Sequence, residues 1–261
     1  MLKLPVPDRR RLQNAALPLV VVQVRFDERA DVIASDVLAR FHLELEAAGL
    51  TGLRLTPLVG NQLIFRPGDL PVEASATKRG WTLATGDGQW QFTILGDSLA
   101  LETPAFVEFD GLRELFALAL AGVTHALSPT VAGRIGLRFV NALPRVCAEN
   151  GDVLPWSQCV TPMLTSALSD PLLGAGVTAM DVRVALTVDE QIRASVRAGL
   201  IPDGDSERFL MDIDSYCELG TLWDPARIEE ILVRLNEVSV SLFQSLLSEP
   251  MLTHLRGEEQ R

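Results

Sequence analysis

The chain has 261 residues, 48% of them hydrophobic, which is enough to bury a substantial core in one large domain or two small ones. Its formal net charge of -11, without any basic run, argues against nucleic acid as a partner and favours either plain solubility or a basic protein partner. The three cysteines are odd in number and lack C-x-x-C spacing, which argues against a disulfide framework or a zinc site and favours a reducing cytoplasm.

The first elements predicted are a strand, a helix and a second group of strands. Leu19 to Phe26 is rich in valine and is typical of a strand. Asp31 stands where a helix cap belongs, and apolar residues then recur at helical spacing from Ala34 to Ala48. Leu53 to Phe65 predicts one or two short strands, and the polar, glycine-containing stretch from Pro67 to Gly80 predicts a loop.

A three-strand meander and a buried helix are predicted next. Trp81 to Thr85 and Gln89 to Leu95 flank Gly-Asp-Gly, a hairpin signal, and Ser98 to Thr103 continues the meander. Asp110-Gly111 then opens a helix that is apolar on most sides as far as Val123.

The second half of the chain predicts four strands and a long helix. The predicted strands are Val131 to Leu143, Val177 to Val188, Gln191 to Ile201 and Arg208 to Leu219. Asp224-Pro225 combines an acceptor cap with proline at the first helical position. The buried stripe of this last helix consists of Ile228, Ile231, Leu232, Leu235, Val238, Leu242 and Leu246. We expect Pro250 to end the helix and the polar segment from Arg256 to Arg261 to fray.

This order of elements predicts an α+β protein, with one or more antiparallel sheets and helices packed on one face. Two organisations stay open. The chain forms one continuous domain, or it forms an N-terminal strand-helix-meander-helix-strand lobe, 1–145, and a C-terminal lobe of three strands and a long helix, 146–261.

Two of the predicted strands concentrate the charges. In the strand from Val131 to Leu143, Arg134 and Arg138 share one face. In the strand from Arg208 to Leu219, Asp212 and Asp214 share one face, and the rise per strand residue places them about 6–7 Å from each other. Arginines of suitable parity on the neighbouring strands are Arg183, Arg193 and Arg197. These seven residues form the candidate site, either as structural cross-strand ion pairs or as a face whose arginine forks bind a carboxylate or phosphate.

The segments Arg134-Ile-Gly-Leu-Arg-Phe-Val-Asn141 and Phe209-Leu-Met-Asp-Ile-Asp214 resemble a sporadically distributed bacterial family of similar length. Its members pair an R-I-G-L-R-[YF]-x-N segment with a late F-L-x-D-I-D segment. The strand Val20 to Phe26 looks alike as well, so the resemblance covers nearly the whole chain. It implies a bacterial cytosolic protein, and it implies no particular activity, cofactor or catalytic residue.

Other chemistry-bearing patterns have simpler explanations. Gly96-Asp-Ser-Leu99 looks like the nucleophile block of GDSL hydrolases, but no histidine completes a D-x-x-H block, and Gly96-Asp97 fits a hairpin turn better. His42 and His125 lack further ligands nearby in the sequence, so we expect packed or partly exposed histidines and no metal site.

The sequence favours a non-catalytic interaction or accessory protein that associates with itself or with another protein. We expect it to be cytoplasmic and to need no cofactor: it has no secretory signal, and its apolar stretch from Leu17 to Val24 is too short to span a bilayer. The alternative is a small-molecule binder or enzyme that uses the arginine and aspartate face on an anionic ligand.

Overall fold

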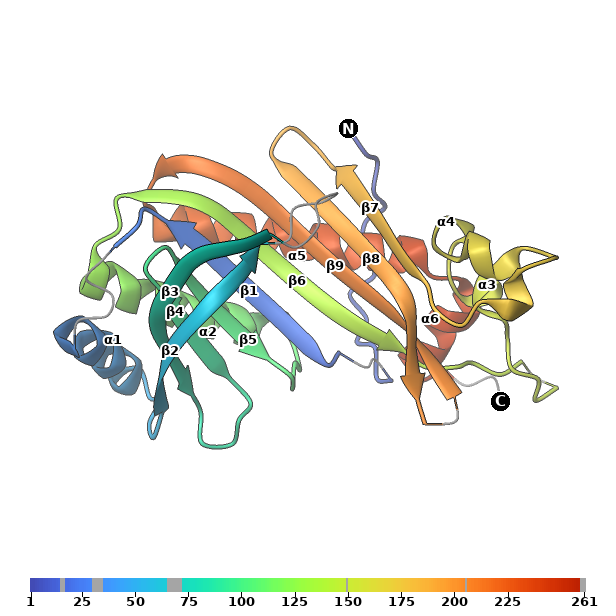
Figure 1. The fold of residues 1–261 in the computed structure, drawn as a ribbon, viewed down its shortest axis with the longest axis horizontal. Coiled ribbons are helices and arrows are strands. Elements are labelled where there is room, and N and C mark those ends of the chain that lie inside the picture. The colour runs from blue at the N-terminus through green and yellow to red at the C-terminus, as the bar shows by residue number, and fades with distance from the viewer. Residues whose placement is uncertain (15–16, 30–34, 65–71, 149, 205, 259–261) are drawn as a thin grey trace. The chain divides into compact units, whose positions relative to one another are not determined.

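The computed structural model describes residues 1–14, 17–29, 35–64, 72–148, 150–204 and 206–258. Within these ranges, nine strands form one antiparallel sheet in the order β2-β3-β4-β5-β1-β6-β9-β8-β7, accompanied by six α-helices (Figure 1). The predicted α+β class is therefore confirmed.

The strands are β1 Leu19–Phe26, β2 Arg54–Ile64, β3 Val72–Ala84, β4 Gln91–Leu95, β5 Ser98–Thr103, β6 Val131–Leu143, β7 Asp181–Thr187, β8 Ile192–Asp203 and β9 Ser206–Leu222. The helices are α1 Ser35–Ala47, α2 Phe109–Leu127, α3 Trp156–Cys159, α4 Pro162–Thr165, α5 Pro225–Leu246 and α6 Glu249–Arg256, with short 3-10 turns η2 Ser166–Ser169 and η3 Gly174–Gly176.

The chain divides into two compact units. One consists of Met1–Val20, Gly136–Cys217 and Ile231–Arg261, and the other of Val21–Ile135 and Glu218–Glu230. We call them the α5 unit and the α2 unit, after the main helix of each. The expected lobe boundary between residues 145 and 146 stays a prediction.

In the α5 unit, helix α5 lies across the apolar face of the strands (Figure 1). The predicted stripe is confirmed for Leu235 and Leu242, whose exposures are 0% and 3%. The contact with the sheet includes one polar pair, because the buried hydroxyl of Ser239 donates to that of Ser215 on β9 at 2.9 Å. Hydrophobic burial on this face supplies most of the stabilisation, and the serine pair leaves neither hydroxyl unsatisfied.

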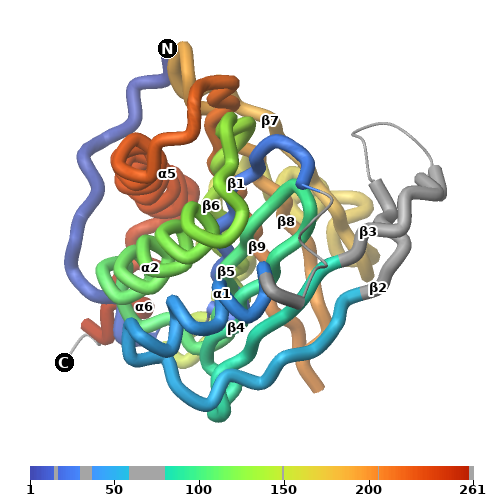
Figure 2. Tube along the Cα trace, turned by 90° about the vertical axis from the view of Figure 1, so that its left-hand side faces the viewer, coloured from blue at the N-terminus to red at the C-terminus, as the bar shows by residue number. Residues whose placement is uncertain are grey.

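The N-terminal segment runs beside α5 on the side that the sheet does not cover (Figure 2). Ser241 donates a hydrogen bond to the carbonyl oxygen of Pro5 at 2.6 Å. Gln244 accepts from the Asp8 N–H at 2.8 Å and donates to the Asp8 carbonyl at 2.7 Å. The Asp8 carboxylate binds Arg10 and Arg256. The hydrogen bond from Arg10 is the main reason why the pKa of Asp8 is lowered to about 2, and the charge of Arg256 adds to the effect. Helix α5 is thus held from two sides.

In the α2 unit, helices α1 and α2 pack together at a close approach that only glycine allows. A Cβ on Gly122 would lie 2.9 Å from the ring of Phe41, well inside van der Waals contact. Trp223 contacts both β1 and α2. Its ring meets that of Phe26 edge-on, with the ring centroids 5.8 Å apart, and its Nε1 donates to Thr124 Oγ1 at 2.9 Å. The hairpin turn predicted at Gly96-Asp97 lies between β4 and β5, as expected.

Two sequence-based expectations are wrong. The part of the predicted loop from Val72 to Gly80 belongs to β3, which pairs with β2, because backbone pairing to a neighbouring strand does not require apolar side chains. The rest of that loop, together with Asp31 and Ala34, lies outside the described residues. Pro250 does not end α5 but stands in the first turn of α6, where a missing N–H costs nothing. Met251 and Leu255 are fully buried and hold this helix in place.

The predicted cap of α5 is present. Asp224 Oδ1 accepts the N–H of Ala226 at 3.0 Å and that of Arg227 at 3.3 Å. We predict that Asp224→Ala lowers the free energy of unfolding by about 1 kcal/mol, the usual loss for an N-cap. Asp224→Asn is the matched control, since asparagine caps equally well, and it should lose little. Urea unfolding of the purified variants measures both, and equal stability of Asp224→Ala and the wild type would contradict the cap.

Candidate functional site

The best-formed contact among the candidate residues joins Arg138 on β6 to Asp212 on β9, both in the α5 unit. Arg138 donates from Nε to Oδ1 at 2.8 Å and from Nη2 to Oδ2 at 2.7 Å. Asp212 is buried, with 8% exposure, whereas the Arg138 side chain is 46% exposed. The hydrogen bonds from Arg138 to Asp212 raise the pKa of the guanidinium, which also feels the charge of Asp214. This is the bidentate geometry in which an arginine fork binds a carboxylate most strongly.

A second bidentate pair lies on the same face of the sheet and was not anticipated. Arg197 donates from Nε and Nη2 to the two oxygens of Asp181 at 3.0 Å each, and Arg183 lies 3.6 Å from the same carboxylate. The hydrogen bond from Arg197 is the main reason why the pKa of Asp181 lies below its usual value. The strand register places Arg183 opposite Arg197, and Arg197 opposite Asp212. We call Arg138, Asp181, Arg183, Arg197 and Asp212 the charged face.

The remaining candidate residues are not part of these two bidentate pairs. Arg193 donates to the carbonyl oxygens of Asp189 at 2.7 Å and of Ile192 at 3.3 Å, and so stabilises the β7–β8 turn. Asp214 stands opposite Ser195 in the ladder of β8 and β9. Arg134 belongs to the α2 unit, where its Nε lies 3.7 Å from Glu218. The structure thus brings four of the seven predicted residues together and adds Asp181.

The charged face is neutralised largely from within. Both oxygens of Asp212 and both of Asp181 already accept hydrogen bonds from an arginine fork. An external carboxylate or phosphate would have to displace a carboxylate that is tethered to the sheet and therefore present at high effective concentration. The geometry favours a structural role for these pairs.

The two pairs differ in burial, so their contributions to stability should differ. We predict that Asp212→Ala lowers the free energy of unfolding by about 2 kcal/mol, between the values for exposed and fully buried pairs. In the double variant with Arg138→Ala, part of this loss should be recovered. Asp181→Ala is the matched control: it has the same bidentate geometry, but its side chain is 45% exposed, and it should lose about 0–1 kcal/mol. Equally small losses for both carboxylates would contradict a structural role for Asp212.

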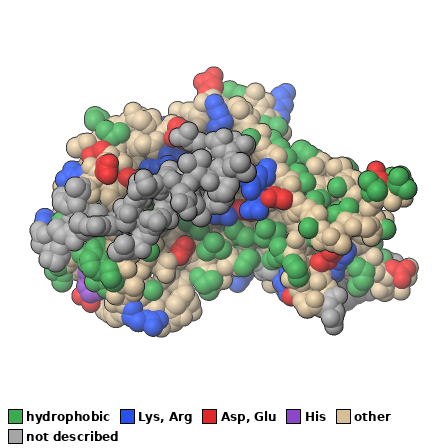
Figure 3. Space-filling view, in the orientation of Figure 1, with side chains coloured by type: hydrophobic (Ala, Val, Ile, Leu, Met, Phe, Trp, Pro, Cys, Tyr) green, Lys and Arg blue, Asp and Glu red, His purple; other side chains and the backbone are tan. Residues whose placement is uncertain are grey.

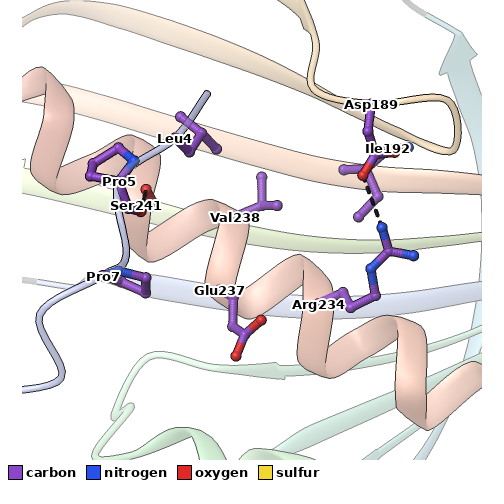
Figure 4. Close-up of a pocket in the computed structure, with 9 residues that line it drawn as sticks. All are labelled: Leu4, Pro5, Pro7, Asp189, Ile192, Arg234, Glu237, Val238 and Ser241. Atoms are coloured by element: carbon purple, nitrogen blue, oxygen red, sulfur yellow. Dashed lines mark hydrogen bonds and ion pairs between the residues drawn. The ribbon is translucent and has the colours of Figure 1, made fainter. Parts of the chain in front are cut away.

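A cavity of about 200 Å³ lies between the N-terminal segment, α5 and the β7–β8 turn (Figure 4). Leu4, Pro5 and Val238 are among its apolar lining residues, and the ion pair of Arg234 with Asp189 at 2.9 Å lies at one end. Ligand pockets usually measure about 300–1,000 Å³. The cavity is therefore better explained as a packing gap beneath the N-terminal segment.

The other chemistry-bearing residues form local contacts. Ser98, in the GDSL-like segment, is buried at 3% exposure and donates to its neighbour Asp97 at 3.2 Å. His42 lies 3.7 Å from Glu46, and His125 lies 3.2 Å from Glu44. Within the ranges that the structure describes, no three histidine, cysteine or acidic side chains come together in a way that could hold a metal ion.

An exposed turn after η2 was missed from the sequence. The carboxylate of Asp170 accepts the N–H groups of Leu172 at 2.9 Å and of Leu173 at 2.7 Å, and its carbonyl oxygen accepts the Gly174 N–H at 2.9 Å. The two leucines are nevertheless 86% and 66% exposed. We call residues 170–174 the dileucine turn. Hydrophobic side chains are visible at the end of the face in Figure 3 where α3 and α4 lie in Figure 1. The signal in the sequence was Asp-Pro followed by two leucines and a glycine, a turn motif with apolar residues in the place of polar ones.

Comparisons with models of protein families, with curated protein sequences and with solved structures find no match to this chain. In the described ranges, no helix has both the length and the apolar character needed to cross a bilayer. What the chain does must therefore follow from its own residues.

Proposed function

We propose that the protein is a cytoplasmic, non-catalytic interaction or accessory protein that associates with other protein chains, itself included, through exposed apolar surface. The observation that carries the proposal is the dileucine turn. Two adjacent leucines stay in water while three hydrogen bonds to Asp170 fix the backbone beneath them. A fixed backbone lowers the entropy cost of binding, so such a pair is well suited to insert into an apolar groove.

The charges of the residues that flank the turn in the sequence indicate what kind of partner fits it. No lysine or arginine occurs from residue 146 to residue 182, a stretch that includes Asp152, Asp170 and Asp181. This stretch of the chain supplies no basic side chain that could attract a nucleic acid or an anionic membrane. An apolar protein groove with a neutral or basic rim complements this surface best.

The anionic-ligand alternative has less support. An anionic ligand could bind only to arginine side chains whose N–H groups are available to it. Arg138 and Arg197, however, each donate two hydrogen bonds to a carboxylate of the same chain. Binding an anion would strand Asp212, a buried charge, without its partner. We therefore favour the interaction function.

A photo-crosslinking residue placed at Leu172 tests the proposal directly. It should capture a protein in cells, whereas the same residue at Val107, an exposed apolar position in the α2 unit at 61% exposure, should not. Replacing Leu173 by Asp in the crosslinking protein should reduce the captured amount severalfold. The Leu173→Asp substitution should change the free energy of unfolding by no more than about 0.5 kcal/mol, because the Leu173 side chain lies on the surface.

Asp170→Ala supplies the matched control for the turn itself. This variant keeps both leucines but loses the two side-chain hydrogen bonds that hold the turn, so capture should also fall. Equal capture at positions 172 and 107, or capture that is indifferent to both substitutions, would count against the dileucine turn as a binding surface.

A further inference from the structure

Among the residues that the structure describes, strand β7 ends the sheet in the α5 unit, with β8 as its one neighbour in the strand order. An edge strand presents a row of backbone N–H and C=O groups to which another strand can pair. The alternate residues Val182, Val184 and Leu186 are only half-buried, and Asp181 and Arg183 on the other face are exposed. The edge thus offers backbone groups, an apolar row and two opposite charges.

We infer that a second copy of this chain pairs antiparallel with β7, about a two-fold axis that passes through Val182. This inference rests on the proposed interaction function and names one partner for it. In this register, Asp181 stands opposite the partner's Arg183, Arg183 stands opposite the partner's Asp181, and Val182 meets its own symmetry mate. Met180 stands opposite the partner's Val184 on the apolar side.

The charges select this register over its neighbours. A symmetric antiparallel pair must place residues of equal parity opposite one another, so the axis passes through a residue. An axis at Arg183 would set two arginines directly opposite, which is destabilising. An axis at Val184 would set Arg183 opposite Ala185 and bring the two arginines onto a diagonal. Only the axis at Val182 converts both charges into cross-strand ion pairs.

The contacts within one copy leave room for this pairing. Arg183 is 58% exposed and lies 3.6 Å from its own Asp181, a looser contact than the 3.0 Å bonds from Arg197. Its guanidinium is therefore able to turn toward a second carboxylate. At the far end of the strand, the Leu2 N–H donates to the Val188 carbonyl oxygen at 2.9 Å. The proposed axis lies at the opposite end of β7, away from that contact.

Charge reversal gives a decisive test, because two repelling variants should attract each other. Light scattering during size-exclusion chromatography should show a concentration-dependent dimer for the wild type. Arg183→Asp and Asp181→Arg should each be monomeric alone, since each brings like charges together. Their equimolar mixture should form a heterodimer, because every pair across the axis is then an aspartate with an arginine. Arg208→Asp, which breaks an exposed pair with Asp203 at 2.7 Å in the β8–β9 hairpin, is the control and should remain a dimer.

A disulfide trap reads the register independently. In a Cys147→Ser background, which removes the exposed native thiol, Val182→Cys should form an intermolecular disulfide under a mild oxidant. Val184→Cys should do so severalfold more slowly, because its opposite residue is the partner's Met180. Faster crosslinking at 184 than at 182 would overturn the register. A wild type that stays monomeric at its highest soluble concentration, or a dimer that survives Arg183→Asp, would overturn the pairing.

These outcomes separate the two proposals. A monomeric protein that still captures a different protein through position 172 would retain the proposed function and lose only the self-pairing. A β7 dimer with no capture at position 172 would retain self-association and remove the dileucine turn from the account.

Discussion

The structure of the α5 unit depends on the pleat of β9, whose side chains are anchored on both faces. Asp212 points to one face, where Arg138 holds it with two hydrogen bonds, and Ser215 points to the other, where Ser239 of α5 donates to it. A slip of one residue would turn the buried carboxylate toward α5 and leave a charge without its partner. Ion pairs and helix packing therefore specify the same register from opposite sides of the sheet.

The different roles of the two faces of the sheet also determine which surfaces of the α5 unit stay open to another molecule. One side of the strands is covered by α5, and the other carries arginines and aspartates that satisfy each other. The apolar surfaces left in this unit include the half-buried apolar row of β7 and the exposed leucines of the dileucine turn. Exposed leucines are unusual for a turn, since loops normally carry polar residues, whereas the edge of β7 combines its apolar row with the exposed charges of Asp181 and Arg183. Both surfaces support the proposed association over the alternative of anionic-ligand binding.

Features set by local periodicity could be predicted from the sequence, and features set by partner strands could not. The alternation in β6 and β9 predicted a charged face, and Asp224-Pro225 predicted where α5 begins. The choice of Asp181 as the partner of Arg197 depends on the β7–β8 register, which alternation alone does not fix. The strand residues from Val72 to Gly80 are held by pairing with β2, and Pro250 reads equally well as the end of one helix or the start of another. The dileucine turn was missed because an exposed apolar pair gives no periodic signal.

The claim that the β7 edge is an association surface can be tested most directly by amide hydrogen exchange at several protein concentrations. If two copies pair through β7, the amides of Asp181–Thr187 that point away from β8 should exchange more slowly as concentration rises, while the exposed turn at Asp87–Gln89 should exchange at a constant rate. Exchange in β7 that is equally fast at every concentration would contradict the account.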